Sequence, residues 1–454
     1  MREIVETQRQ FFHTHVTRDV AFRIRALKKL QQTIREWEPR ISEALHADLG
    51  KSATEGYMCE IGLVLGSLRD TLKNIRKWSR ARRVSASLAH FPSSCRVEAD
   101  PYGVVLIMSP WNYPVLLCLD PLIAALSAGN CCVVKPSSTT PATSAVLAEM
   151  LGSIFPPEYV KVVLGGRENC NALLEEKFDY IFFTGSPNVG HTIMEAAARH
   201  LTPVTLELGG KSPCIVDKDC NVKVAARRIA FGKILNAGQT CVAPDYLLIH
   251  ASRKQEFVTE FREAVAEMLG EHPVQNENLT HIITPRHFER IMGLMNEATP
   301  VVGGQGNAAT LRIEPTLLDN VTPDSASMQE EIFGPLLPML SWNKWEDVEG
   351  FVLSRPRPLA SYLFTTNRET EQNFRQHLAF GGGCVNDTII HLAVHGMPFG
   401  GVGNSGMGAY HGKTGFDTFT HYKSILKKGN WLDLPFRYQP YNKLKSCLLR
   451  LFLR

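Results

Sequence analysis

The chain has 454 residues, of which 44% are hydrophobic and 21% charged, and its formal net charge is +4. This composition is that of a globular protein with room for two or three domains, and it excludes an intrinsically disordered chain. The charge is small for this length, and aromatic residues are not interleaved with dense Lys and Arg except near the C-terminal end. A nucleic-acid surface is therefore not expected. The composition instead favours a function in small-molecule chemistry.

The N-terminal segment and the cysteines predict a cytoplasmic protein. The chain opens on Met1-Arg2-Glu3-Ile4 and continues into charged, helix-like sequence, without an apolar signal core or an uncharged stretch long enough to span a bilayer. The 11 cysteines are an odd number and show no CxxC spacing. This pattern is typical of reduced thiols and predicts neither a disulfide framework nor a metal site.

The N-terminal region predicts helix. Apolar residues between positions 24 and 45 recur at spacings of three and four, which is the pattern of an amphipathic helix. These residues are Ile24, Leu27, Leu30, Ile34, Trp37, Ile41 and Leu45. Pro39 lies inside the run, and because proline removes a helical hydrogen bond we expect a break between two helices there.

Short apolar runs separated by helix-length segments follow. They are residues 103–108, 132–134, 160–164 and 180–183, and then 214–216, 246–249, 336–340 and 360–364. This alternation is the βαβ rhythm of a parallel sheet, and its restart after Gly209-Gly210 predicts a second α/β domain. Glu207 and Cys241 lie on either side of that junction. Clefts between domains commonly hold substrates.

Two strand ends are candidates for nucleotide binding. The strand that ends at Thr184 is followed by Gly185-Ser186-Pro187-Asn188-Val189-Gly190 and then by a helix-like segment. Such a turn offers N–H groups and a helix dipole to a phosphate, but it matches GxGxxG poorly, and a tight turn without a ligand is the alternative. Lys135 ends another strand, where it is positioned to contact a ribose or a phosphate. The alternative is a solvated lysine without a ligand.

Cys241 and Glu207 supply the two groups that acyl chemistry needs. Cys241 ends Gly238-Gln239-Thr240-Cys241, and Glu207 begins Glu207-Leu208-Gly209-Gly210-Lys211, 34 positions upstream. A thiolate attacks a carbonyl carbon, and a carboxylate activates the water that hydrolyses the resulting thioester. The pair alone is also compatible with a papain-like cysteine hydrolase, which would need a histidine partner and no cofactor.

Seven short motifs are distributed along the chain between about Gly103 and Tyr422. They are Pro110-Trp111-Asn112-Tyr113-Pro114, Lys135-Pro136-Ser137, Phe183-Thr184-Gly185-Ser186, Glu207-Leu208-Gly209-Gly210-Lys211-Ser212-Pro213, Gly238-Gln239-Thr240-Cys241, Glu331-Ile332-Phe333-Gly334-Pro335 and Pro398-Phe399-Gly400-Gly401-Val402-Gly403-Asn404-Ser405-Gly406. Together, and in this order, they resemble those of the NAD(P)-dependent aldehyde dehydrogenase superfamily, and most closely its class 3 branch, which includes fatty aldehyde dehydrogenases. The resemblance covers nearly the whole chain.

The resemblance implies an α/β, aldehyde dehydrogenase-like fold with three parts. Residues 1–83 and 102–208 would form a Rossmann-type cofactor-binding domain, and residues 209–420 an α/β catalytic domain. Residues 84–101 and 421–454 would form a small oligomerisation element and tail. Class 3 members are typically dimers, so a homodimer is expected.

The resemblance also implies the role of each site residue. Cys241 would attack the aldehyde, and the Asn112 side-chain amide and the Cys241 backbone N–H would hold the oxyanion of the thiohemiacetal. After hydride transfer to NAD or NADP, Glu207 would activate the water that releases the carboxylic acid. The implied cofactor contacts are Lys135, Ser138, Gly185, Ser186, Val189, Leu208, Glu331 and Phe333. Without the family resemblance, the alternative interpretation of Glu331 is a carboxylate at the start of a helix, since acidic residues favour the first turn.

Position 138 departs from the family pattern. Many members have Glu after Lys-Pro-Ser, which binds the adenosine ribose hydroxyls and repels a 2′-phosphate, whereas this chain has Ser138. A neutral residue beside Lys135 removes that repulsion. We therefore expect appreciable use of NADP as well as NAD.

Two other functions remain open at this point. A CoA-acylating dehydrogenase would pass the acyl group to CoA and would need no water-activating carboxylate, so Glu207 argues against it. A non-catalytic binding or structural protein with the same fold would not need Asn112, Glu207, Cys241 and Glu331 together. Substrate length would depend on side chains such as Tyr57, Tyr113 and those between Ile389 and His395, with His391, His395 and His411 as further candidates for the funnel.

The C-terminal tail carries the positive charge of the chain. Residues 421–454 contain eight Lys or Arg and one Asp, which leaves the rest of the chain with a net charge of −3. Leu444, Cys447, Leu448, Leu451 and Phe452 share one helical face, so a basic amphipathic helix is expected. It would pack on the body or on a partner subunit, or alternatively bind a membrane surface peripherally, with Cys447 as an acylation candidate.

Overall fold

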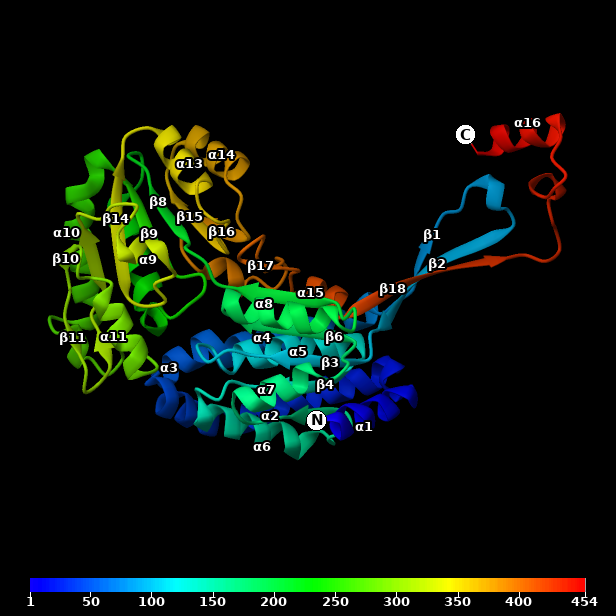
Figure 1. Ribbon diagram of the computed structural model, residues 1–454, viewed down its shortest axis with the longest axis horizontal. Helices are drawn as coiled ribbons and strands as arrows, with labels where there is room; N and C mark the ends of the chain where they lie inside the picture. The colour runs from blue at the N-terminus through cyan, green and yellow to red at the C-terminus, as the bar shows by residue number, and fades with distance from the viewer. Residues whose placement is uncertain (454) are drawn as a thin grey trace.

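The computed structural model describes residues 1–453, and a six-stranded sheet forms the core of its first α/β unit (Figure 1). The strand order is β17-β7-β6-β3-β4-β5. All neighbours are parallel except β17, which pairs antiparallel to β7. The strands are β3 (Val104–Met108), β4 (Cys131–Lys135), β5 (Val160–Val162), β6 (Tyr180–Gly185), β7 (Val204–Leu208) and β17 (Gly406–Met407).

Helices cover this sheet, as a parallel sheet buried on both faces requires. They are α1 (Arg2–His13), η1 (Val16–Arg18), α2 (Val20–Leu49), α3 (Ala53–Gly56), η2 (Tyr57–Ile61), α4 (Gly62–Trp78), α5 (Leu116–Ala128), α6 (Pro141–Ile154), α7 (Arg167–Leu174), α8 (Pro187–Ala198) and α15 (Gly412–Thr418). The expected break at Pro39 is wrong, because α2 runs through it as one helix of 30 residues. Fully buried residues on both sides, Ile34 and Ile41, hold the helix to the core and outweigh the lost hydrogen bond.

A seven-stranded sheet forms the core of the second unit, in the order β10-β13-β14-β9-β8-β15-β16. Only β10 is antiparallel to its neighbour. The strands are β8 (Pro213–Val216), β9 (Tyr246–His250), β10 (Thr299–Val302), β13 (Thr316–Asp319), β14 (Leu336–Trp342), β15 (Ala360–Phe364) and β16 (Gly382–Val385), and β11 (Gly306–Asn307) and β12 (Arg312–Ile313) form a separate hairpin. The α/β fold predicted from the apolar runs is confirmed, and each predicted run overlaps one strand.

The helical segments of the second unit connect these strands. They are α9 (Val222–Ile234), η4 (Leu235–Gly238), η5 (Ala251–Arg253), α10 (Lys254–Leu269), η6 (Pro273–Gln275), α11 (Pro285–Gly293), α12 (Ala326–Gln329), α13 (Trp345–Leu353), α14 (Arg368–His377) and η7 (Ile390–Ala393). The chain then returns to the first unit, where β17 and α15 lie. The predicted segment 209–420 therefore does not correspond to the second unit alone, since its last residues join the first sheet.

A three-stranded antiparallel arm projects from the first unit (Figure 1). It contains β1 (Arg82–Val84), β2 (Ser93–Pro101) and β18 (Thr420–Lys428), in the order β1-β2-β18, with η3 (Leu88–His90) at the turn. η8 (Pro435–Arg437) and the predicted tail helix α16 (Lys443–Phe452) lie beside the far end of the arm. Among the described residues, no helix combines the length and the apolar character that crossing a bilayer requires.

Candidate active site

The loop that carries Cys241 has an unusual backbone. Asn236, Ala237 and Gly238 have φ values of 51°, 50° and 69°, so three successive residues adopt the left-handed conformation. Non-glycine residues remain in this region only where the surroundings fix them. A Cβ at Gly238 would also collide with the Gly334 carbonyl. The glycine of the Gly-Gln-Thr-Cys motif is therefore needed for both its φ and its close contact.

Gln239 fixes this loop with its side-chain amide. The Nε2 donates to the carbonyl oxygens of Asn236 (3.1 Å) and His281 (3.0 Å), and Oε1 accepts from the Ile283 N–H (3.0 Å). Both N–H donors of the amide and one lone pair of its oxygen thus act within the protein. These hydrogen bonds hold the loop that leads to Cys241.

Glu207 is the next-to-last residue of β7, which places it at the carboxyl-terminal end of the strands of the first sheet. The residue is buried, and neither carboxylate oxygen has a hydrogen-bond partner among the described residues. Burial raises the pKa of Glu207 well above its usual value. A buried carboxylate without partners is costly to keep in a fold, which is expected where the group serves a reaction.

The environment of Cys241 favours the neutral thiol. Burial raises the pKa of Cys241, and the negative charges of Glu331 and Glu207 raise it further, while the backbone N–H groups of Cys241 and Val242 act in the opposite direction. The thiol must therefore lose its proton to a base before it attacks.

Asn112 approaches the same loop from the first unit. It is buried, and its Nδ2 donates to the Gln239 carbonyl oxygen over 3.0 Å. A side-chain amide has two N–H donors, so a second one remains for a ligand. Tyr113, the next residue, shares a 2.6 Å hydrogen bond with the Thr240 hydroxyl, next to Cys241.

Two cavities meet at Cys241 and Glu207. One has about 1090 Å³ of empty space and a mostly apolar lining, and the other has about 710 Å³ and carries more polar groups. Thr184, Glu207 and Cys241 line both. A molecule in either cavity therefore reaches the same thiol and carboxylate.

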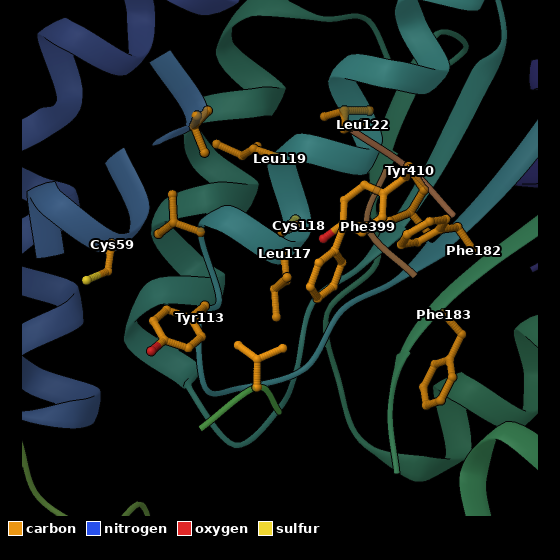
Figure 2. Packing of buried hydrophobic residues seen from close by; sticks show 14 of the residues in the cluster. Cys59, Tyr113, Leu117, Cys118, Leu119, Leu122, Phe182, Phe183, Phe399 and Tyr410 are labelled. Carbon is orange, nitrogen blue, oxygen red and sulfur yellow. The ribbon is translucent and has the colours of Figure 1, made fainter. Parts of the chain in front are cut away.

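The apolar cavity includes several of the residues predicted to line a substrate funnel. Tyr113 and Leu117 from the α5 region, Cys59 from η2, and Phe399 and Tyr410 from the chain around β17 border it (Figure 2). Further apolar lining residues are Met58, Leu63, Phe231, Leu235, Leu359 and Leu392. His395 and His411 line it as expected, whereas Tyr57 and His391 do not.

The polar cavity brings together several of the predicted cofactor residues. It is lined by Asn112, Gly185, Ser186, Leu208, Glu331 and Phe333, which are predicted site residues. Glu331 Oε1 is buried without a partner among the described residues, so it is available to ribose hydroxyls. A Cβ at Gly209 would collide with the Glu331 carboxylate, which explains the glycine there. Phe333 lies edge-on to Trp111, with ring centroids 5.3 Å apart, and presents an apolar surface for a planar ring.

Three predicted cofactor residues do not line this cavity. Lys135 is buried at the end of β4, its Nζ donates to the Pro136 carbonyl oxygen (2.7 Å), and burial lowers its pKa. Ser138 is exposed beyond it, and Val189 is exposed on α8. β4 and β6 flank β3 in a parallel sheet, so Lys135 and Gly185 share its carboxyl edge, where α/β sheets bind ligands.

Several residues of the site were not predicted from the sequence. His287 and Arg290 line the polar cavity from α11, and Arg290 Nη2 donates to the Ile332 carbonyl oxygen (2.5 Å) beside Glu331. Their spacing places them on one helix face, but nothing in the sequence connects α11 with position 331. Thr184 lines both cavities and was visible only as part of a motif. The described residues contain no cluster of three or more His, Cys, Asp or Glu able to hold a metal ion.

Comparison with known proteins decides the family. A model of the aldehyde dehydrogenase family matches residues 1–425. The chain belongs to the aldehyde dehydrogenase family. It is 46% identical to the 4,4'-diaponeurosporen-aldehyde dehydrogenase of Staphylococcus aureus over 95% of this chain and 94% of that protein. It is 42% identical to the dimeric, NADP-preferring aldehyde dehydrogenase of Canis lupus familiaris, covering 96% and 97% of the two chains.

A solved structure confirms the fold. The substrate-bound state of Staphylococcus aureus AldH superposes with a TM-score of 0.98 at 44% identity, covering 100% of this chain and 99% of the other. Other similar proteins are named as members of aldehyde dehydrogenase family 3, in agreement with the class 3 resemblance. This aldehyde dehydrogenase uses NAD or NADP to oxidise an aldehyde to the corresponding acid.

Proposed function

We propose that this aldehyde dehydrogenase acts on apolar aldehydes, either aliphatic ones of medium to long chain or aromatic ones, and that Cys241, Asn112 and Glu207 carry the chemistry. The observation that supports this most is the position of Cys241 and Glu207 where the apolar cavity meets the polar one. The Staphylococcus aureus relative is named for an aldehyde, 4,4'-diaponeurosporen-aldehyde, which is compatible with this proposal.

Each residue has a defined task in this proposal. Cys241 Sγ adds to the aldehyde carbon, and the free N–H of the Asn112 amide and the Cys241 backbone N–H stabilise the oxyanion. When bound in the polar cavity, held by Glu331, Phe333, Leu208, Gly185 and Ser186, the oxidised nicotinamide supplies the hydride acceptor. Glu207 then takes a proton from the water that hydrolyses the Cys241 thioester.

A series of saturated aldehydes of increasing length tests the substrate class. We expect kcat/KM to rise about fourfold for each methylene that enters the apolar cavity, which corresponds to about 0.8 kcal/mol per buried CH₂ group. The measurement is the growth of nicotinamide absorbance with and without CoA. A flat or falling series would contradict the proposed substrate, and a requirement for CoA would favour the acylating alternative.

Cofactor preference provides a separate prediction. Ser138 is exposed and neutral, and Lys135 lies three residues before it, so nothing at position 138 repels a 2′-phosphate. The dog relative is named as NADP-preferring. We expect kcat/KM for NADP to lie within about a hundredfold of that for NAD, about 2.7 kcal/mol. Ser138→Glu is expected to reduce NADP use selectively. A larger NAD preference in the unaltered enzyme would overturn this expectation.

The arm and the tail support a homodimer with peripheral membrane contact. β18 pairs with β2 on one side only, so its other edge is open, and Ile425 and Leu426 are exposed on it. In α16, Leu444 and Leu451 are exposed on a helix that also carries Lys443 and Arg450, and α16 stacks Phe452 on Phe436 of η8 rather than on the two sheets. We place the enzyme in the cytoplasm at the membrane surface, with residues 84–101 and 421–454 as its assembly element. Residues 1–83 with 102–208 would bind the cofactor, and residues 209–420 would form the catalytic segment, of which strand β17 joins the first sheet.

Truncation after residue 439 distinguishes the two roles of this element. We expect the full chain to sediment with anionic liposomes and the truncated chain to stay in the supernatant, because the lost segment carries the exposed leucines and much of the basic charge. Both chains should have the mass of a dimer by light scattering, since β18 is retained. Equal liposome binding by the two chains would contradict the membrane contact, and a monomeric mass of the full chain would contradict the dimer.

A further inference from the structure

The short segment between α2 and α4 carries a buried ion pair to which the proposed reaction gives no task. Lys51 and Glu60 are both fully buried, and Lys51 Nζ lies 2.6 Å from Glu60 Oε1. A buried ion pair is often no more stabilising than apolar side chains of the same volume. The importance of this ion pair therefore lies in the groups that its two charges orient, and not in the stability of the fold.

Lys51 holds the backbone that carries Asn112. Lys51 Nζ donates to the Asn112 carbonyl oxygen over 2.8 Å and lies 4.2 Å from the centroid of the Tyr113 ring. An ammonium group has three N–H donors, and here a carboxylate, a carbonyl oxygen and an aromatic ring surround it. The position of Asn112 is thus fixed at its backbone, and the second N–H of its side-chain amide, beside the one that donates to Gln239, remains for a ligand.

Glu60 holds the other end of the same turn. Its Oε2 accepts hydrogen bonds from the N–H groups of Val115 (2.7 Å) and Leu116 (3.2 Å), where α5 begins. The N-cap residue of α5 provides no side-chain hydrogen bond, so Glu60 takes over that task from a distant part of the chain. Glu60 lies in η2, a π-helical turn, and such turns are frequent at functional sites.

Glu55 extends the arrangement to the nucleophile loop. Its Oε1 accepts from the Asn236 N–H over 2.8 Å, and Asn236 is the first of the three left-handed residues that precede Cys241. Asn236 Nδ2 donates to the carbonyl oxygens of Asn112 (2.9 Å) and Gln239 (2.9 Å). One short segment, residues 51–60, therefore binds both the loop of the oxyanion donor and the loop of the nucleophile.

We infer that Lys51, Glu60 and Glu55 are positioning residues that set the Asn112 amide relative to Cys241 and so determine the rate of the chemical steps. The inference rests on the proposed role of Asn112 at the oxyanion. The two loops come from different α/β units, and neither sheet alone fixes their separation. Displacing the donor weakens a contact made mainly in the transition state, so kcat is expected to fall while the KM for aldehyde changes little.

The double variant Lys51→Met/Glu60→Gln removes the ion pair without leaving a buried charge. We expect it to lower kcat about a hundredfold, as a displacement of about 1 Å does in other enzymes. Its dissociation constant for NAD(P)+ and its thermal midpoint measure whether the fold and the polar cavity are retained. In an Asn112→Ala background the same double substitution should lower kcat less than about threefold, because its effect passes through Asn112.

The outcomes of this cycle separate the two proposals. Equal factors in the two backgrounds, or no loss of kcat in the double variant, would overturn the positioning role. An Asn112→Ala enzyme as active as the unaltered one would instead overturn the oxyanion role of Asn112. The matched control is Lys254→Met, which breaks the 2.6 Å ion pair with Asp319 on the outer part of the second unit and should leave kcat unchanged.

Glu55 offers a second test that keeps the ion pair intact. Glu55→Gln retains an oxygen acceptor for the Asn236 N–H, whereas Glu55→Ala removes it. We expect the alanine variant to lose about tenfold in kcat and the glutamine variant to stay within about threefold of the unaltered enzyme. An equal loss in both variants, or no loss with alanine, would contradict the inference even where the double variant does not fold.

Discussion

Replacing Cys241 by serine is expected to lower kcat/KM for aldehyde oxidation by about 10⁴-fold or more. A serine hydroxyl ionises far less readily than a thiol and is a weaker nucleophile, and removing a covalent nucleophile from other enzymes costs on the order of 10⁶ in kcat. Binding of NAD(P)+ should remain, because the other residues of the polar cavity are untouched. Absorbance growth at the nicotinamide wavelength measures the first effect, and cofactor titration measures the second.

Cys384 is the matched control for this variant. It is a second half-buried cysteine, and its Sγ lies 3.6 Å from His391 Nδ1, the kind of Cys–His contact that a papain-like hydrolase would use. Burial raises the pKa of Cys384 to about 11 and lowers the pKa of His391 to about 4, so both groups are neutral at pH 7 and form no thiolate–imidazolium pair. Cys384→Ser should retain full activity. If it were inactive and Cys241→Ser active, the assignment of the nucleophile would be wrong.

Replacing Glu207 by glutamine is expected to slow thioester hydrolysis about 10³-fold, within the range of general base catalysis. Acylation should be slowed less, so each active site should produce one burst of NAD(P)H followed by slow turnover. Mass spectrometry of the quenched protein should then find the acyl group on Cys241. Slow turnover without a burst would indicate that Glu207 acts before the thioester forms.

The raised pKa of Glu207 also fixes the sign of two pH dependences. The hydrolysis rate should rise with pH up to the elevated pKa of Glu207, because only the ionised carboxylate accepts a proton, and Glu207→Gln should remove this rise. Below the ordinary carboxyl pKa, Glu207 is protonated in both the folded and the unfolded chain. Between that pKa and the raised pKa of the folded state, only the folded chain keeps the proton, so the free energy of unfolding falls as pH rises between the two values. The glutamine variant should lack this contribution.

Local patterns predicted eight of the 13 strands in the two large sheets, and the failure to predict β7 has a physical cause. Runs such as residues 104–108 are buried at every position, so apolar side chains alone identify them. β7 was missed because Glu207 interrupts its apolar run, although the chain buries that carboxylate. The predicted break at Pro39 is wrong because the packing of α2 against the core keeps this helix continuous. The family motifs predicted Cys241, Glu207 and Asn112 as site residues, and their roles await the variants above.

The sequence by itself determined the family and the use of NAD or NADP, and it predicted Cys241 as the nucleophile and Glu207 as the carboxylate, because these depend on the chemical identity of a few residues in short motifs. Only the tertiary structure brought Lys51 and Glu55 to the loops of Asn112 and Cys241, and His287 to the polar cavity. The hydrogen bonds of Lys51 and Glu55 to these loops join residues that are 61 and 181 positions apart. No local periodicity records them, because they arise from the packing of whole elements around two sheets.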